Sequence, residues 1–190
     1  MTNPYTIPNL LTGLRIALIP VIVGLFYLPY NWSDMACGLL FALVGITDAF
    51  DGYFARKLGQ VSRLGAFLDP VADKLIVVTA LVLIVSKNPV WYVTLTAAVI
   101  IGREIAISAL REWMAEIGAR HKMKVSGVAK FKTIVQITGL SMMLFQQDLL
   151  TLPIYRIGLA LTILAAVLTL WSMVAYLRGA WPELRGFRQT

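Results

Sequence analysis

Residues 48–73 read Asp48-Ala-Phe-Asp51-Gly52-Tyr-Phe-Ala55-Arg56-Lys-Leu-Gly-Gln-Val-Ser-Arg-Leu-Gly65-Ala-Phe-Leu-Asp69-Pro-Val-Ala-Asp73. They hold four carboxylates in a chain rich in long apolar segments, where an ionised carboxylate is costly unless it is paired or coordinated. If the flanking segments are helical, Asp48 and Asp51 project from one helix face, because they are three residues apart. Asp69 and Asp73, four residues apart, share a second face. Two such faces predict a cage of hard oxygen ligands that suits Mg²⁺ or Mn²⁺ and not zinc, because neither Cys nor His joins it.

The composition is that of an integral membrane protein. Of the 190 residues, 58% are hydrophobic and the mean hydropathy is +0.76, whereas a soluble domain usually has fewer apolar and more charged residues. The net charge is +7, and this excess belongs at the membrane surface, where it would attract anionic lipids or phosphorylated substrates. Nucleic acid is not an expected partner. Cys37 is the only cysteine, which excludes a disulfide within the chain.

Six segments are predicted to span a bilayer as helices, each of which needs about 20 largely apolar residues. They run from about Pro8 to Tyr27, Met35 to Arg56, Gly65 to Val85, Val90 to Leu110, Lys132 to Phe145 and Pro153 to Leu177. The fifth has the shortest apolar run. No repeat or low-complexity linker divides the chain. The sequence therefore predicts an all-α integral membrane protein with six transmembrane helices in a single domain, residues 1–190.

The basic residues predict how these helices are oriented. The connections after the first, third and fifth segments hold almost no Lys or Arg, whereas the opposite ends are rich in them. The basic positions are Arg56, Lys57, Arg63, those from Arg103 to Lys132, Arg178, Arg185 and Arg188. By the positive-inside rule, both termini and the connections after the second and fourth segments are cytoplasmic. The aspartates then lie near the cytoplasmic face, within reach of soluble substrates and of lipid.

The aspartates belong to a longer pattern, D-x2-D-G-x2-A-R-x8-G-x3-D-x3-D. Its fixed places are occupied by Asp48, Asp51, Gly52, Ala55, Arg56, Gly65, Asp69 and Asp73. The pattern resembles, without departure, the signature of the CDP-alcohol phosphatidyltransferase family. The resemblance implies a six-helix membrane enzyme, usually a dimer, that moves a phosphatidyl group from a CDP-linked lipid to an alcohol and releases CMP.

For the acidic positions the resemblance implies metal binding and base catalysis. Asp48, Asp51 and Asp69 would hold two ions of Mg²⁺ or Mn²⁺, and Asp73 would be a further metal ligand and the general base. The chemistry of these residues agrees, because displacement at phosphorus calls for positioning, neutralisation of developing charge and a base beside the attacking hydroxyl. The alternative is structural: buried ion pairs between the aspartates and nearby Arg and Lys.

For the nucleotide the resemblance implies a pocket lined by other positions of the same pattern: Gly52, Ala55, Arg56 and Gly65. It extends to the first helix, where N-x2-T-x2-R places Asn9, Thr12 and Arg15 on one face. In the family this face helps to form the nucleotide and metal region, and Asn9 and Thr12 are the expected nucleotide-binding residues. Both can instead cap or hydrogen-bond the start of the helix.

A second block of cations lies in the fourth and fifth segments. Arg103 is deep enough in its helix that its charge needs a partner, and Arg111 lies about two turns closer to the cytoplasm. With Lys130 and Lys132 they predict a pocket for the phosphate of a phosphorylated acceptor. The block resembles the phosphatidylglycerophosphate synthase branch of the family, bacterial enzymes that use glycerol 3-phosphate. This chain has Ala129 where that branch usually has glycine.

With the family that it resembles, the sequence predicts an enzyme in contact with membrane lipids that joins the phosphatidyl group of CDP-diacylglycerol to glycerol 3-phosphate. The resemblance further implies a homodimer in a bacterial cytoplasmic membrane. Other interpretations stay open. The acceptor can instead be inositol phosphate, serine or a phosphatidyl lipid. The second block can instead bind anionic headgroups or pair with Glu104 and Glu112. A divalent-cation transporter also has carboxylates on facing helices, although these should lie at the bilayer midplane rather than near one face.

Overall fold

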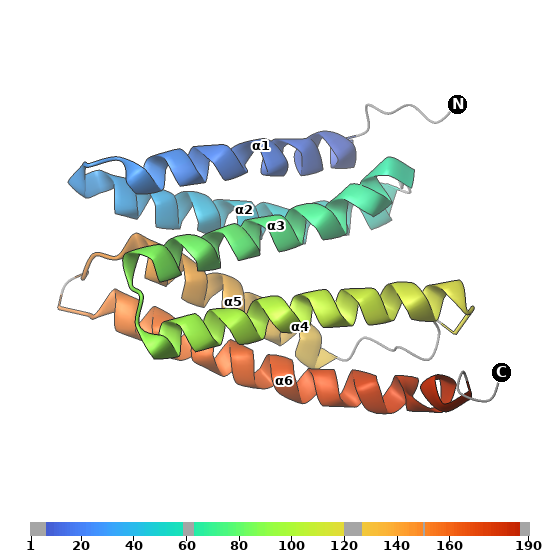
Figure 1. The fold of residues 1–190 in the computed structure, drawn as a ribbon. Coiled ribbons are helices and arrows are strands. Elements are labelled where there is room, and N and C mark those ends of the chain that lie inside the picture. Colours follow the sequence, from blue (N-terminus) through green and yellow to red (C-terminus); the bar gives the residue numbers. More distant parts are fainter. Residues whose placement is uncertain (1–6, 59–62, 120–126, 150, 187–190) are drawn as a thin grey trace.

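The computed structural model describes residues 7–58, 63–119, 127–149 and 151–186, drawn as the coloured ribbon in Figure 1. Within these ranges the chain forms six α-helices: α1 (Ile7–Tyr27), α2 (Asn31–Leu58), α3 (Arg63–Lys87), α4 (Trp91–Glu116), α5 (Gly127–Phe145) and α6 (Ile154–Gly186). In lipid a backbone must satisfy its own hydrogen bonds, and a helix does so within one segment. The prediction of an all-α, six-helix protein is confirmed.

The helices run further than the predicted spans, mostly at one end. α4 continues six residues beyond Leu110, α6 continues to Gly186, and α5 already begins at Gly127. The prediction counted only residues inside the hydrocarbon layer, whereas a helix can continue with charged residues into the headgroup region. Among the described residues, α1, α4 and α6 are long and apolar enough to cross a membrane, and α5 has a shorter apolar run.

The six helices lie lengthwise beside one another as a bundle (Figure 1). α1 packs against α2 and α3, α5 packs against α2 and α6, and α4 packs against α3 and α6. In Figure 1, α1 begins and α6 ends at the same end of the bundle, where α2 and α4 also end. This end is called the terminal end below. It is the end at which the sequence concentrates its basic residues.

The main buried core is a cluster to which all six helices contribute, and a small second cluster is formed by Met114, Ala119 and Ala180. Fully buried side chains include Ile22 of α1, Phe41 of α2, Ile84 of α3, Ile100 of α4 and Leu140 of α5. Other large apolar side chains point outward, and Trp171 of α6 is 78% exposed. An apolar exterior suits a protein surrounded by lipid. In lipid, the fit between helix surfaces, rather than burial of apolar side chains away from water, decides which helix faces pack together.

Helices α5 and α6 approach most closely where two glycines meet. A Cβ added at Gly158 would lie 2.7 Å from the carbonyl oxygen of Gly139 and 2.9 Å from the backbone nitrogen of Met143. A Cβ added at Gly139 would lie 2.9 Å from the carbonyl oxygen of Gly158. Backbone atoms cannot rotate out of the way, so this helix contact requires residues without side chains.

We expect Gly158→Ala to lower the midpoint of thermal unfolding in detergent by about 2–12 °C. Overpacking costs about 1–3 kcal/mol, and about 1 kcal/mol shifts the midpoint by roughly 2–4 °C in a chain of this size. Gly24→Ala in α1 is the matched control, because an added Cβ there meets nothing within 4 Å. Equal midpoints for the two variants would contradict the close approach of α5 and α6.

Candidate active site

Helices α1, α2 and α3 bring polar side chains together in the half of the bundle nearer the terminal end. Nη1 of Arg15 in α1 lies 2.8 Å from Oδ1 of Asp48 in α2 and 2.5 Å from Oδ1 of Asp73 in α3. One turn earlier on α1, the hydroxyl of Thr12 donates a hydrogen bond to Oδ1 of Asp69. These five residues, Thr12, Arg15, Asp48, Asp69 and Asp73, are called the aspartate cluster.

The spacing of the residues explains this local pairing. Thr12 and Arg15 are three residues apart on α1, and Asp69 and Asp73 are four residues apart on α3, so each pair shares one helix face. When α1 packs against α3, two side chains of one face meet two of the other. Asp48 joins them because α1 also packs against α2.

Charge and exposure divide the aspartate cluster into a buried cation and accessible carboxylates. The side chain of Arg15 is 4% exposed, whereas those of Asp48 and Asp73 are 37% and 46% exposed. Asp48 and Asp69 lie within electrostatic range of Asp73. Such carboxylates repel one another unless a cation lies among them. The cluster therefore favours positive charge and remains open to a ligand from outside.

The donor chemistry of the aspartate cluster fits a hard divalent cation. Three carboxylates without Cys or His are the ligands that Mg²⁺ and Mn²⁺ prefer, and the guanidinium of Arg15 marks a place where positive charge is stabilised. Among the side chains that the structure describes, no three acidic, His or Cys groups already have the arrangement of a metal site. The side chain of Asp51, the fourth predicted ligand, lies outside the described part of the chain.

The remaining predicted nucleotide residues are placed only in part. Asn9 belongs to α1, and Gly52, Ala55 and Arg56 belong to the last turns of α2, but their side chains and surroundings lie outside the described part of the chain. Gly65 is buried near the start of α3, one turn before Asp69. The helices that carry these residues, α1, α2 and α3, all reach the terminal end of the bundle (Figure 1).

Helices α4, α5 and α6 form a second polar cluster, here called the cation cluster: Arg103, Glu104, Arg111, Lys132, Ser172 and Tyr176. Oε1 of Glu104 lies 2.8 Å from Nη1 of Arg103 and 3.3 Å from Nζ of Lys132. Nη2 of Arg103 donates a hydrogen bond of 2.9 Å to Oγ of Ser172. Arg103 and Lys132 are both buried. The sequence-based alternative that these cations pair with Glu104 thus holds for two of them, while Glu112 is exposed.

Arg111 is held by an aromatic side chain of α6. Its Nη2 donates a hydrogen bond of 2.9 Å to the hydroxyl of Tyr176, and its guanidinium carbon lies 5.1 Å from the centre of that ring. Arg111 also lies within electrostatic range of Lys132. The structure therefore brings together three of the four predicted acceptor-binding residues, and the side chain of Lys130 lies outside the described part of the chain.

Sequence reasoning missed the contribution of α6. Ser172 and Tyr176 were not predicted to belong to the site, yet they contact the two arginines of α4. They are four residues apart in a mostly apolar helix, and such a pair of hydroxyl groups on one face was the available signal. The ion pairs of Arg15 with Asp48 and Asp73 are of the kind that the structural alternative expected between the aspartates and nearby Arg and Lys, although the sequence did not single out Arg15 as the partner.

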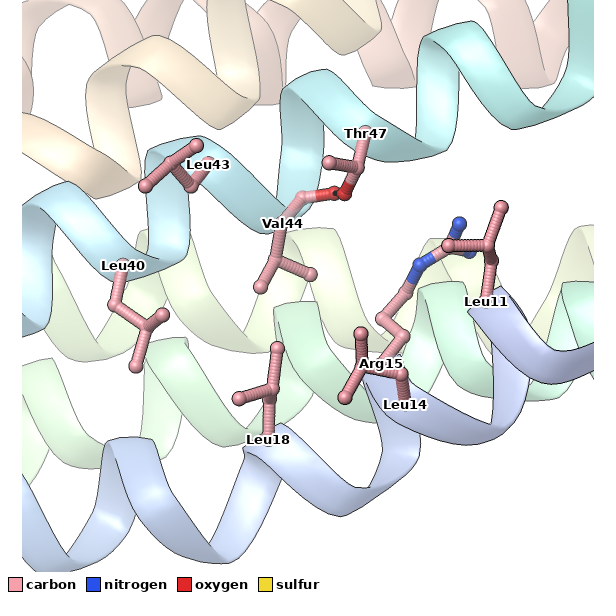
Figure 2. Close-up of a pocket in the computed structure, with 8 residues that line it drawn as sticks. All are labelled: Leu11, Leu14, Arg15, Leu18, Leu40, Leu43, Val44 and Thr47. Atoms are coloured by element: carbon pink, nitrogen blue, oxygen red, sulfur yellow. Dashed lines mark hydrogen bonds between the residues drawn. The ribbon is translucent and has the colours of Figure 1, made fainter.

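A groove between α1 and α2 opens beside Arg15 (Figure 2). Apart from Arg15 and Thr47 its lining is apolar: Leu11, Leu14, Leu18, Leu40, Leu43 and Val44. Figure 2 shows Arg15 reaching from α1 toward α2 at the end of the groove where Thr47 lies. Leu14 and Leu43 are 54% and 58% exposed, so the groove is open to its surroundings. An apolar track thus ends at a charged group of the aspartate cluster.

Comparison with known proteins agrees with these observations. The CDP-alcohol phosphatidyltransferase family model matches residues 5–171. Curated proteins named "CDP-diacylglycerol--glycerol-3-phosphate 3-phosphatidyltransferase" are similar over nearly the whole chain. That of Shigella flexneri serotype 5b (strain 8401) is 49% identical over 95% of this chain and 97% of the relative. That of Pseudomonas fluorescens is 52% identical over 94% of this chain and 92% of the relative. That of Salmonella typhi is 49% identical over 95% of this chain and 97% of the relative. This chain therefore belongs to the CDP-alcohol phosphatidyltransferase family, as the spacing of its aspartates predicted.

Proposed function

We propose that this protein transfers the phosphatidyl group of CDP-diacylglycerol to the primary hydroxyl of glycerol 3-phosphate, which gives phosphatidylglycerol phosphate and CMP. The observation that carries the proposal is the presence of two clusters of opposite charge in one bundle, the aspartate cluster of α1–α3 and the cation cluster of α4–α6. One suits a cation-bound diphosphate, and the other suits the phosphate of the acceptor. The names of the curated relatives support the same reaction.

We place the metal ions at the aspartate cluster. Asp48, Asp69 and Asp73 would hold them together with Asp51, and the ions would be two of Mg²⁺ or Mn²⁺. When bound, such ions neutralise charge on the diphosphate and on the departing CMP. Thr12 holds Asp69 in place, and Arg15 holds one oxygen of Asp73. Thr12, Gly65 and the residues Asn9, Gly52, Ala55 and Arg56 are the proposed lining for the nucleotide.

Asp73 is the proposed general base. Its Oδ1 contacts Arg15, and its side chain is 46% exposed, so an acceptor can approach the carboxylate from outside. The oxygen of the acceptor hydroxyl forms a bond to the phosphatidyl phosphorus, and its proton goes to Asp73. The bond from that phosphorus to the bridging oxygen of the diphosphate breaks, and CMP leaves with that oxygen. Holding the base beside the hydroxyl supplies the orientation that the reaction needs.

The groove of Figure 2 supports a lipid donor. Its leucine lining would accept one acyl chain of CDP-diacylglycerol, while its end at Arg15 would bring the lipid's diphosphate to the aspartate cluster. A soluble nucleotide sugar or a bare metal ion would have no use for an apolar track that ends at these charges. The groove therefore favours phosphatidyl transfer over a divalent-cation transporter.

The cation cluster is the proposed site of the acceptor's phosphate, bound by Arg103, Arg111, Lys130 and Lys132. We expect Arg111→Ala to raise the KM for glycerol 3-phosphate about tenfold, because a charge-assisted hydrogen bond contributes about 1.5 kcal/mol or more. The KM for CDP-diacylglycerol should change little. Arg178→Ala, which removes an exposed arginine from α6, is the control. An unchanged KM for the acceptor would remove Arg111 from the pocket.

Release of CMP tests the proposal directly. The purified protein is given CDP-diacylglycerol with Mg²⁺ or Mn²⁺ and, in separate reactions, glycerol 3-phosphate, inositol phosphate, serine or a phosphatidyl lipid. We expect CMP release with glycerol 3-phosphate and little with the others. Turnover with serine and none with glycerol 3-phosphate would overturn the acceptor. Metal flux into vesicles without any CMP release would favour a transporter.

The topology and assembly are further parts of the proposal. The positive-inside rule supports a cytoplasmic terminal end in a bacterial cytoplasmic membrane, with the active site open to that side. The match of the family model to residues 5–171 supports one catalytic domain over residues 1–190. We also propose that the protein forms a homodimer surrounded by membrane lipids, because members of the family that it resembles are usually dimers.

A further inference from the structure

Glu104 lies between two buried cations of the cation cluster. Its Oε1 accepts from Nη1 of Arg103 at 2.8 Å and from Nζ of Lys132 at 3.3 Å. The side chains of Arg103 and Lys132 are each 7% exposed, whereas that of Glu104 is 26% exposed. A buried cation without a partner is strongly destabilising, so this carboxylate stabilises the cation cluster while no ligand is bound. Because the side chain of Glu104 is partly exposed, it can leave its two partners without crossing the protein.

The cation cluster still has a surplus of positive charge and an unused donor. One carboxylate compensates two buried cations, and a third cation, Arg111, lies within electrostatic range of Lys132. Nε of Arg103 is buried and has no hydrogen-bond partner among the described residues. A phosphate monoester carries close to two negative charges near neutral pH and three acceptor oxygens. It would therefore compensate the cluster more fully than one carboxylate does.

A phosphate and the carboxylate of Glu104 compete for the same two donors. We propose that Glu104 is an internal counter-ion, which takes the place of the acceptor's phosphate while no acceptor is bound and turns away from Arg103 and Lys132 when a phosphorylated acceptor binds. This inference rests on the proposed function only in assigning the cluster to the acceptor. Glu104 is a positioning residue in this account: it makes the unliganded protein more stable and acceptor binding weaker.

The test replaces Glu104 with glutamine, which keeps the size of the side chain and removes its charge. We expect the KM for glycerol 3-phosphate to fall about threefold to tenfold, since one competing ion pair is lost, while the KM for CDP-diacylglycerol stays the same. Glu112→Gln, an exposed position on the same helix, should change neither value. A higher KM for glycerol 3-phosphate in Glu104→Gln would overturn the proposal, because Glu104 would then assist binding.

A second measurement needs no turnover and so separates this inference from the proposed reaction. Thermal unfolding of the purified protein is followed with and without inorganic phosphate. We expect Glu104→Gln to unfold at a lower temperature than the unsubstituted protein without phosphate, and phosphate to raise its midpoint by more. An equal effect of phosphate on both proteins would overturn the proposal. Glu104→Asp, which keeps the charge but is one methylene shorter, should show the same trend to a smaller degree and serves if the glutamine variant does not fold.

Discussion

Asp73→Asn should lower the rate of CMP release by about 10²–10⁴-fold, the range that a general base contributes. Asparagine keeps the size of the side chain, and its amide oxygen can still accept the hydrogen bond that Nη1 of Arg15 donates over 2.5 Å in the unsubstituted protein. It cannot take a proton from the acceptor hydroxyl. The measurement is the initial rate of CMP release at saturating CDP-diacylglycerol and glycerol 3-phosphate.

Binding of CDP-diacylglycerol should survive this substitution, because Asp48 and Asp69 remain. It is measured by the rise in the midpoint of thermal unfolding on adding the lipid. The control is Asp34→Asn, which removes a carboxylate at the other end of the bundle, where Asp34 pairs with Lys87 at 2.6 Å. That variant should keep its activity. Near-normal turnover in Asp73→Asn would remove Asp73 from the role of base, whatever its effect on stability.

Arg15→Gln should destabilise the protein, and a divalent cation should restore much of the loss. The guanidinium of Arg15 lies between Asp48 and Asp73, so its removal leaves two carboxylates of different helices to repel each other. Removing one partner of a buried pair costs about 3–5 kcal/mol. The two carboxylates are 37% and 46% exposed, so screening by solvent reduces the expected cost to about 1–2 kcal/mol. The midpoint of unfolding should fall by roughly 2–8 °C in a chelator.

In saturating Mg²⁺ or Mn²⁺ the difference between Arg15→Gln and the unsubstituted protein should shrink, because a metal ion at the aspartate cluster supplies the missing positive charge. Arg156→Gln, an exposed position at the start of α6, is the control and should behave like the unsubstituted protein in both conditions. If Arg15→Gln loses the same stability with and without metal, the metal ions do not bind beside Arg15.

Much of the fold and the chemistry could be predicted from local patterns. Long apolar segments predict membrane helices because a spanning segment must satisfy its backbone within itself and present apolar side chains to lipid. The aspartate pattern predicts the family because eight fixed positions over residues 48–73 leave little room for coincidence. The helix ends were less accurate, as α4 and α6 show, because a helix does not stop where the hydrocarbon layer stops.

The partners of the charged residues could not be predicted in the same way. Helical periodicity assigns Thr12 and Arg15 to one face of α1, but it does not say which helix that face meets. Arg15 contacts Asp73, 58 residues away along the chain, because α1 packs against α3. In the cation cluster, Ser172 of α6 contacts Arg103 of α4 across 69 residues. Such pairs depend on the fit of helix surfaces, to which many side chains contribute at once.

By itself, the sequence determined that this chain is a membrane-embedded, all-α member of its family, and which residue types are available for phosphatidyl transfer. Each of these properties follows from composition or from spacing along one helix. Only the tertiary structure decided that Arg15 lies among the carboxylates and that Glu104 lies between Arg103 and Lys132. These placements depend on how separate helices pack, and a charge takes its partner from whichever helix the packing brings within reach.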